Sequence, residues 1–187
     1  IGMIAGTWMA SGIIPALIYY GLKILHPSIF LPASCVICSI VSLLTGSSWT
    51  TIATIGIALL GIGKALGVEE GWIAGAIVSG AYFGDKVSPL SDTTVLAATT
   101  TGTPLFSHIK YLMLTTVPSM IITLIIFTIA GLSYNSTDAI DIAAYSQALD
   151  AKFDISLWLL IVPIATGLMI AKRLPSIVTL FLSALLA

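Results

Sequence analysis

The sequence has very little charge. Only 8% of its 187 residues are Asp, Glu, Lys or Arg, and the net charge is −1, whereas soluble domains carry about 25% charged residues. No cluster of basic residues occurs, which argues against nucleic-acid binding and against a polybasic membrane tether. Hydrophobic residues make up 58% of the chain, and its mean hydropathy is +1.10. The composition therefore predicts an integral membrane protein with lipid as its surroundings.

Cysteine is also scarce. Cys35 and Cys38 are the only two, and they form a C-x-x-C pattern within an apolar run. A structural zinc site needs four ligands and more than one such pair, and the sequence offers no second pair. We therefore interpret both as small apolar helix residues and predict no bound cofactor.

Long apolar runs divide the chain into helical segments. A spanning α-helix needs about 20 mainly apolar residues, and residues 1–22 meet this requirement, with Pro15 as the expected kink. Because both ends fall within apolar runs, we interpret the chain as a fragment of a polytopic all-α membrane protein. The expected segments are a span at 1–22, a re-entrant hairpin at 29–66, a broken helix at 71–101, a span at 110–133, a polar interfacial linker at 134–154, a span at 155–171 and a truncated span at 176–187.

The segment 29–66 leaves two interpretations open. Two short apolar runs flank the hydroxyl-rich stretch Gly46-Ser-Ser-Trp-Thr-Thr51, and this pattern fits either a re-entrant hairpin or two full spans. Irregular backbone at membrane depth must be buried or line a cavity, and the Ser and Thr side chains can supply the missing hydrogen bonds. We favour the hairpin.

The stretch from Gly80 to Thr94, GAYFGDKVSPLSDTT, contains three charges within an apolar region. A charged side chain at mid-membrane costs about 2.5–3.5 kcal/mol on insertion scales, so Asp85, Lys86 and Asp92 are expected to pair, titrate or line water. Lys86 can pair with either carboxylate, which leaves the other available for a cation. The alternative is that these charges form only a structural ion pair.

Gly84 and Pro89 are expected to interrupt the helix in this stretch. The first half-helix would end near Gly84 with free carbonyl groups, which favour a cation, and the second would begin at Ser91, a suitable N-cap. Sodium is a hard cation and prefers oxygen ligands. The candidate ligands are Asp85, Asp92, Ser88, Ser91, Thr93 and Thr94 from the broken helix, and Ser47, Ser48 and Thr50 from the hairpin.

Such a site predicts transport rather than catalysis. A carboxylate can hold a sodium ion or a proton, but not readily both, because a bound cation stabilises the ionised form. This competition produces exchange if the site opens to one side of the membrane at a time, as in transporters with broken helices. An aspartic protease would need two carboxylates that share a proton, and a Ser–His enzyme using Ser79 and His108 would lack a recognisable nucleophile motif.

The same residues carry a family resemblance. The stretch from Gly80 to Thr94 resembles the signature of the NhaC-type sodium/proton antiporters, and Gly46-Ser-Ser-Trp49 and Thr103–His108 resemble that family in the same order. The resemblance covers most of residues 27–132. It implies membership of the ion-transporter superfamily, whose members contain two inverted repeats, each with a re-entrant hairpin and a broken helix.

This resemblance implies a sodium/proton antiporter that crosses a bacterial plasma (inner) membrane several times. It also implies that the hairpin tip faces the helix break, and that the chain holds most of the first repeat and the start of the second. The family includes carriers of malate and lactate, and related members move amino acids. The alternative substrate is therefore a small organic anion, contacted by Lys86 and the helix start at Ser91, or an amino acid. The expected partners are lipid, sodium and protons, and the sequence leaves a homo-oligomer open.

Overall fold

A computed structural model describes residues 2–133, 151–153, 155–172 and 176–187. Within these ranges every regular element is helical, which confirms the expected all-α class. The elements, in chain order, are α1 (Gly2–Ala10), α2 (Ile13–Ile24), α3 (Pro27–Thr45), α4 (Ser48–Thr51), the π-helical turn η1 (Ile52–Gly56), α5 (Ile57–Ala65), α6 (Glu70–Val87), α7 (Asp92–Thr100), α8 (Leu105–Leu132), the 3₁₀ turn η3 (Leu157–Leu160), α10 (Ile161–Ala171) and α11 (Ser176–Leu186).

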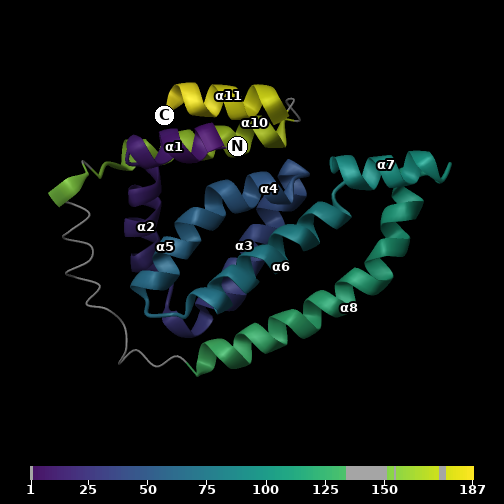
Figure 1. Cartoon of the computed structure of the whole chain (residues 1–187), viewed down its shortest axis with the longest axis horizontal. Coiled ribbons are helices and arrows are strands. Elements are labelled where there is room, and N and C mark those ends of the chain that lie inside the picture. Colours follow the sequence, from purple (N-terminus) through teal and green to yellow (C-terminus); the bar gives the residue numbers. More distant parts are fainter. Residues whose placement is uncertain (1, 134–150, 154, 173–175) are drawn as a thin grey trace.

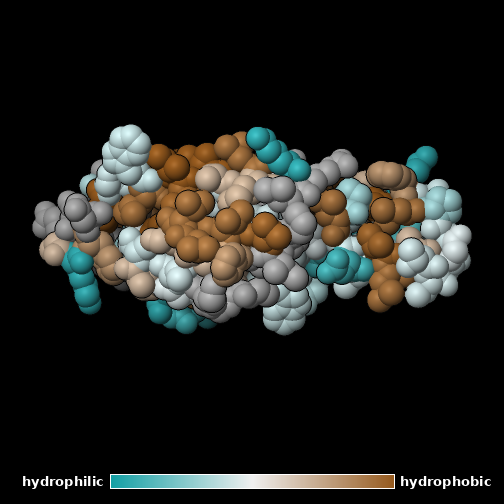
Figure 2. Space-filling model, turned by 90° about the horizontal axis from the view of Figure 1, so that it is seen from above, coloured by the Kyte–Doolittle hydropathy of each residue, from teal (hydrophilic) through white to brown (hydrophobic). Residues whose placement is uncertain are grey.

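Three helical segments of the described chain are long and apolar enough to cross a membrane. They are Pro27–Thr45, Ser48–Ala65 and Leu105–Leu132. The last of these, α8, exposes many of its large apolar side chains, among them Leu114, Ile122 and Ile129. Hydrophobic residues also dominate the middle of the face in Figure 2, with hydrophilic ones mostly near its edges. These surfaces suit contact with lipid and confirm the membrane class.

The N-terminal region differs from the single kinked helix that the sequence suggested for 1–22. Two helices, α1 and α2, meet at Gly12, whose φ of 87° lies in the left-handed region. Pro15 does not produce the change of direction, because it lies in the first turn of α2, where its missing N–H would have no helical partner. The bend therefore occurs at glycine, before the proline.

Residues 27–65 form a helical hairpin in which α3 is followed by α4, η1 and α5 (Figure 1). The turn uses Gly46, with a φ of 66°, and Ser47, whose hydroxyl accepts a hydrogen bond from the Thr50 N–H at 3.3 Å. The two arms contain 19 and 18 residues, or about 27–29 Å of helix. These lengths suit both a re-entrant hairpin and two full spans, so the re-entrant arrangement stays a prediction.

The hairpin packs most closely against α6. Gly80 and Gly84 face α3, and a Cβ atom at either position would overlap backbone atoms of Cys35 or Ser39. Close approach of this kind requires glycine. Gly84 is therefore an interior residue of α6 rather than the point where the helix ends, which corrects the expected break. The helix continues to Val87, and the interruption covers residues 88–91.

The remaining helices lie around this central pair. The long helix α8 contacts both α3 and α6 and is joined to α6 through α7, while α1, α10 and α11 pack together at another edge (Figure 1). Most of the expected interfacial linker at 134–154 lies outside the described residues. The expected span at 155–171 contains η3 and α10.

Candidate functional site

The tip of the hairpin meets the interruption between α6 and α7. A Cβ atom at Gly46 would overlap the carbonyl group of Leu90, so only glycine allows the two backbones to lie this close. Ser88 is completely buried between them. Its hydroxyl donates to the carbonyl of Leu43 at 2.8 Å and accepts from the Leu90 N–H at 3.1 Å. The hairpin tip therefore lies against the interruption between α6 and α7, as the family resemblance implied.

Asp85 is the carboxylate at this contact. It lies half-buried in the last turn of α6, and its Oδ2 accepts a hydrogen bond of 2.8 Å from the hydroxyl of Ser48. Ser48 is buried and is the first residue of α4, immediately after the hairpin turn. The structure therefore joins one predicted ligand from each element.

The other hairpin hydroxyls bond within the tip. Thr50 is buried, and its hydroxyl donates to the Ser47 hydroxyl at 3.1 Å. Thr51 donates to the Ser47 carbonyl at 3.0 Å. These bonds satisfy backbone and side-chain groups at the turn, as expected for irregular backbone away from water. Ser47 and Thr50 thus support the tip, whereas Ser48 reaches across to α6.

The second half of the broken helix is arranged differently. Ser91 occupies the N-cap position of α7, but its hydroxyl pairs with the Thr93 hydroxyl at 2.9 Å instead of a backbone N–H. Thr94 donates to the carbonyl of Lys86 at 3.2 Å, which ties α7 to the end of α6. Asp92 is exposed and, within the described chain, has neither a hydrogen-bond nor an ion-pair partner.

The carbonyl groups at the end of α6 are also less free than expected. The Asp85 carbonyl accepts from the Ser88 N–H at 3.2 Å, and the Lys86 carbonyl accepts from Thr94. Local turn bonds thus occupy two of the acceptors that were expected to face a cation. Besides the Ser88 hydroxyl, the side chain of Asp85 is the oxygen group at this end of α6 that contacts the hairpin.

Lys86 does not form the expected ion pair. Of the described residues, only Lys64 and Glu70 pair, at 2.6 Å, near the opposite end of α6. Lys86 is exposed and lines a cavity between α6 and α8. The reason is geometric: successive helix residues point about 100° apart, so Asp85 reaches the hairpin while Lys86 lies on the stripe of α6 that lines the cavity.

Two features that support the site were not predicted from the sequence. The Ser42 hydroxyl of α3 donates to the Ala81 carbonyl of α6 at 2.5 Å. The π-helical turn η1 follows the tip, and the Thr54 hydroxyl donates to the Thr50 carbonyl at 2.7 Å within this region. π-helical turns are frequent at functional sites. The hydroxyl-rich composition of residues 42–54 was the signal in the sequence. It could not show which groups these hydroxyls bond, or that the helix widens into a π-helical turn at η1.

Together these groups make an oxygen-rich contact between two elements. One carboxylate, Asp85, and one hydroxyl, Ser48, converge from α6 and α4, and oxygen ligands of this type suit a hard cation. Asp92 does not join this contact, since it lies exposed in the first turn of α7.

Comparison with known proteins agrees with these features. A model of the Na+/H+ antiporter family matches residues 4–102 and 80–187. The chain is 44% identical, over 100% of its length, to a malate-2H+/Na+-lactate antiporter of Bacillus subtilis and covers 40% of that protein. It is 45% identical, over 99% of its length, to the Na+/H+ antiporter NhaC of Alkalihalophilus pseudofirmus and covers 40% of it.

A further relative is the Na+/H+ antiporter NhaC of Bacillus subtilis, with 42% identity over 92% of this chain and 39% of the relative. The chain thus spans about two fifths of the length of these curated relatives. No solved structure matches it. The family match covers nearly the whole sequence, and the described helices have the length and apolarity of membrane spans. The chain therefore belongs to the Na+/H+ antiporter family and is part of a multi-pass membrane protein.

Proposed function

We propose that the full-length protein exchanges sodium ions for protons and that Asp85 binds each in turn. The observation that carries this proposal is the 2.8 Å hydrogen bond between Asp85 and Ser48, which links the end of α6 to the hairpin tip. Family membership supports exchange of these two ions, as two relatives are named Na+/H+ antiporters. The half-buried carboxylate supplies the group for which sodium and a proton compete.

The contact also suggests how binding affects the hairpin. In the structure the Ser48 hydroxyl donates to Asp85. When sodium binds the carboxylate, the hydroxyl can rotate and offer an oxygen lone pair to the ion instead. When a proton binds Asp85, the carboxylic acid can in turn donate to the Ser48 oxygen. The ion that is bound thereby sets the direction of hydrogen bonding between α6 and the tip.

Asp92 is the second candidate carrier. It lies in the first turn of α7, where the positive end of the helix dipole stabilises an ionised carboxylate. Its exposure and lack of a partner within the described chain leave it open to cations. We propose Asp85 as the principal carrier, since Asp85 alone of the two contacts the hairpin.

Proton flux in vesicles that contain the full-length protein tests this proposal. A sodium gradient should drive protons in the opposite direction, and Asp85→Asn should abolish this flux. Glu70→Gln is the matched control, because Glu70 is an exposed acidic residue at the other end of the same helix. If Asp85→Asn and Asp92→Asn both leave sodium-driven proton flux intact, neither carboxylate is the carrier.

A coupled organic-acid carrier is the second candidate function. It is favoured by the relative named as a malate-2H+/Na+-lactate antiporter, which matches all of this chain. Malate and lactate are both small 2-hydroxycarboxylates. If the protein carries such an acid, sodium alone should move few protons until malate or lactate is added. Uptake of radiolabelled malate and lactate into the same vesicles separates the two functions.

A further inference from the structure

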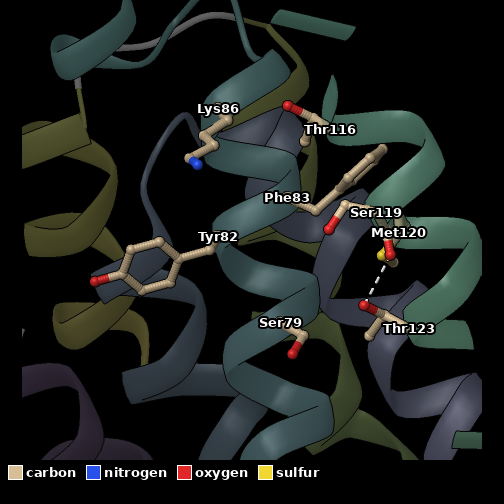
Figure 3. Close-up of a pocket in the computed structure, with 8 residues that line it drawn as sticks. All are labelled: Ser79, Tyr82, Phe83, Lys86, Thr116, Ser119, Met120 and Thr123. Atoms are coloured by element: carbon tan, nitrogen blue, oxygen red, sulfur yellow. Dashed lines mark hydrogen bonds between the residues drawn. The ribbon is translucent and has the colours of Figure 1, made fainter. Parts of the chain in front are cut away.

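A second polar region lies on the face of α6 turned toward α8. A cavity of about 190 Å³ separates the two helices and is open on one side. Eight residues line it (Figure 3): Ser79, Tyr82, Phe83, Lys86, Thr116, Ser119, Met120 and Thr123. Each helix contributes four residues at helical spacing, so one stripe of α6 faces one stripe of α8.

The hydrogen-bond donors of this cavity are largely uncommitted. The hydroxyls of Thr116 and Thr123 donate to carbonyl groups of their own helix, at 2.8 and 2.9 Å. The hydroxyls of Ser79 and Ser119, by contrast, have no hydrogen-bond partner among the described residues, and the Lys86 ammonium group has no ion-pair partner there. One positive charge and the two serine hydroxyls thus remain available beside the cavity, while the Tyr82 hydroxyl points away from α8.

The placement of these groups favours an anion. Figure 3 shows the Lys86 ammonium group turned to the side of α6 that carries Tyr82, while Phe83 extends toward α8. Lysine has a flexible four-carbon stem, so its ammonium group can swing over the opening. A lysine in a membrane-spanning protein is costly unless it finds a partner or water, and a bound anion would supply that partner.

We propose that this cavity binds the carboxylate group of a small organic acid, with Lys86 as its counter-ion and Ser79 and Ser119 as hydrogen-bond donors. Phe83 and Met120 provide apolar surface for the carbon skeleton. The volume equals that of about six water molecules, which suits an acid such as malate or lactate rather than a larger ligand. The inference rests on the second candidate function and assigns its substrate a site distinct from Asp85.

The two sites lie on neighbouring residues of one helix but on different faces. Asp85 contacts Ser48 of the hairpin, and Lys86 lines the cavity against α8. A sodium ion at Asp85 and a carboxylate at Lys86 attract each other. Sodium should therefore tighten binding of the acid, and the acid should tighten binding of sodium by the same factor.

Binding of L-malate to the purified full-length protein tests this inference, and titration calorimetry with and without sodium is the measurement. Lys86→Gln should weaken malate binding about tenfold or more, as expected for loss of a charge-assisted hydrogen bond, whereas Lys86→Arg should retain most of it. Lys110→Gln is the matched control, because Lys110 is an exposed lysine of α8 outside the cavity. Ser119→Leu keeps the ammonium group but fills the cavity, and should also weaken binding.

Equal malate affinity in the wild type, Lys86→Gln and Ser119→Leu proteins would overturn the assignment, and so would no binding of malate or lactate to the wild type. Inorganic phosphate should bind much more weakly, and phosphate binding as tight as malate binding would refute the carboxylate class. Sodium-driven proton flux in acid-free vesicles is measured in parallel. Flux that persists without acid binding would support exchange of sodium and protons while rejecting this site.

Discussion

At the scale of single residues, the hydrogen bond from Ser48 to Asp85 is the contact on which ion binding should depend. A hydrogen bond to a charged group contributes about 1.5–3 kcal/mol. In the Ser48–Asp85 hydrogen bond, donor and acceptor can exchange roles when the carboxylate takes up a proton. Ser48 therefore belongs to the proposed site as much as Asp85 does, although it carries no charge.

We predict that Ser48→Ala weakens sodium binding without preventing folding. Loss of one hydroxyl ligand should raise the sodium concentration for half-maximal proton flux by about tenfold, while Ser48→Thr should retain near-normal behaviour. Thr115→Ala is the control, because the exposed Thr115 hydroxyl bonds only the Leu112 carbonyl of its own helix. Unchanged sodium dependence in Ser48→Ala would remove Ser48 from the site.

For Ser88 we predict an effect on stability rather than on ion binding, because its role is structural. Its buried hydroxyl bonds Leu43 and Leu90, so Ser88→Ala should leave a carbonyl and an N–H group unsatisfied between the tip and the break. Each buried unsatisfied group costs about 1–3 kcal/mol. We expect the thermal midpoint of the solubilised full-length protein to fall. Ser133→Ala, at the exposed end of α8, should leave that midpoint unchanged.

At the scale of the elements, the packing of α6 on α3 positions Asp85. Gly80 and Gly84 allow the two helices to touch through their backbones, and the Ser42 hydroxyl bonds the Ala81 carbonyl across the same contact. Any separation of the helices would move Asp85 relative to the hairpin tip. The glycines of α6 are therefore required for the geometry of the site as well as for stability.

The prediction at this scale compares two glycines of one helix. Gly84→Ala should destabilise the full-length protein by about 1–3 kcal/mol, because a Cβ atom would overlap the backbone of α3. Gly71→Ala should be neutral or slightly stabilising, since no atom lies within 4 Å of a Cβ at that position and alanine favours helix. Thermal unfolding of both variants is the measurement. Equal stability of the two would contradict close packing at Gly84.

At the scale of the whole molecule, the hairpin either turns back within the membrane or crosses it twice. Its arms of 19 and 18 residues are long enough for either arrangement. Trp49 at the tip is 69% exposed, and Lys64 near the open end is exposed as well. Cysteines at these two positions can report on which side of the membrane each lies, and the native Cys35 and Cys38 are completely buried.

For a re-entrant hairpin we predict that a membrane-impermeant thiol reagent labels Lys64→Cys rapidly from one side. It should label Trp49→Cys more slowly, with sodium reducing the rate because the ion holds the tip against α6. Two full spans would instead give rapid labelling of Trp49→Cys from the opposite side only. That result would replace the re-entrant arrangement by two complete crossings.

Much of this organisation could be predicted from the sequence, because membrane surroundings leave few alternatives. Lipid excludes unpaired backbone groups, so apolar runs become helices, and a proline with hydroxyl residues after Val87 indicates an interruption. The end of α6 was predicted too early, at Gly84, since a glycine within a helix and a glycine that ends one look alike in a sequence. The bend at Gly12 was likewise assigned to the nearby Pro15.

The sequence alone determined the class of protein, the broken helix and the set of candidate oxygen ligands, because composition and periodicity act locally. Only the tertiary structure decided which of those ligands meet. It brings Asp85 to Ser48, leaves Asp92 exposed and places Lys86 at the edge of a cavity, without an ion-pair partner among the described residues. The physical reason is that a step of one residue rotates a side chain by about 100° around a helix. The neighbours in each direction depend on how the helices pack.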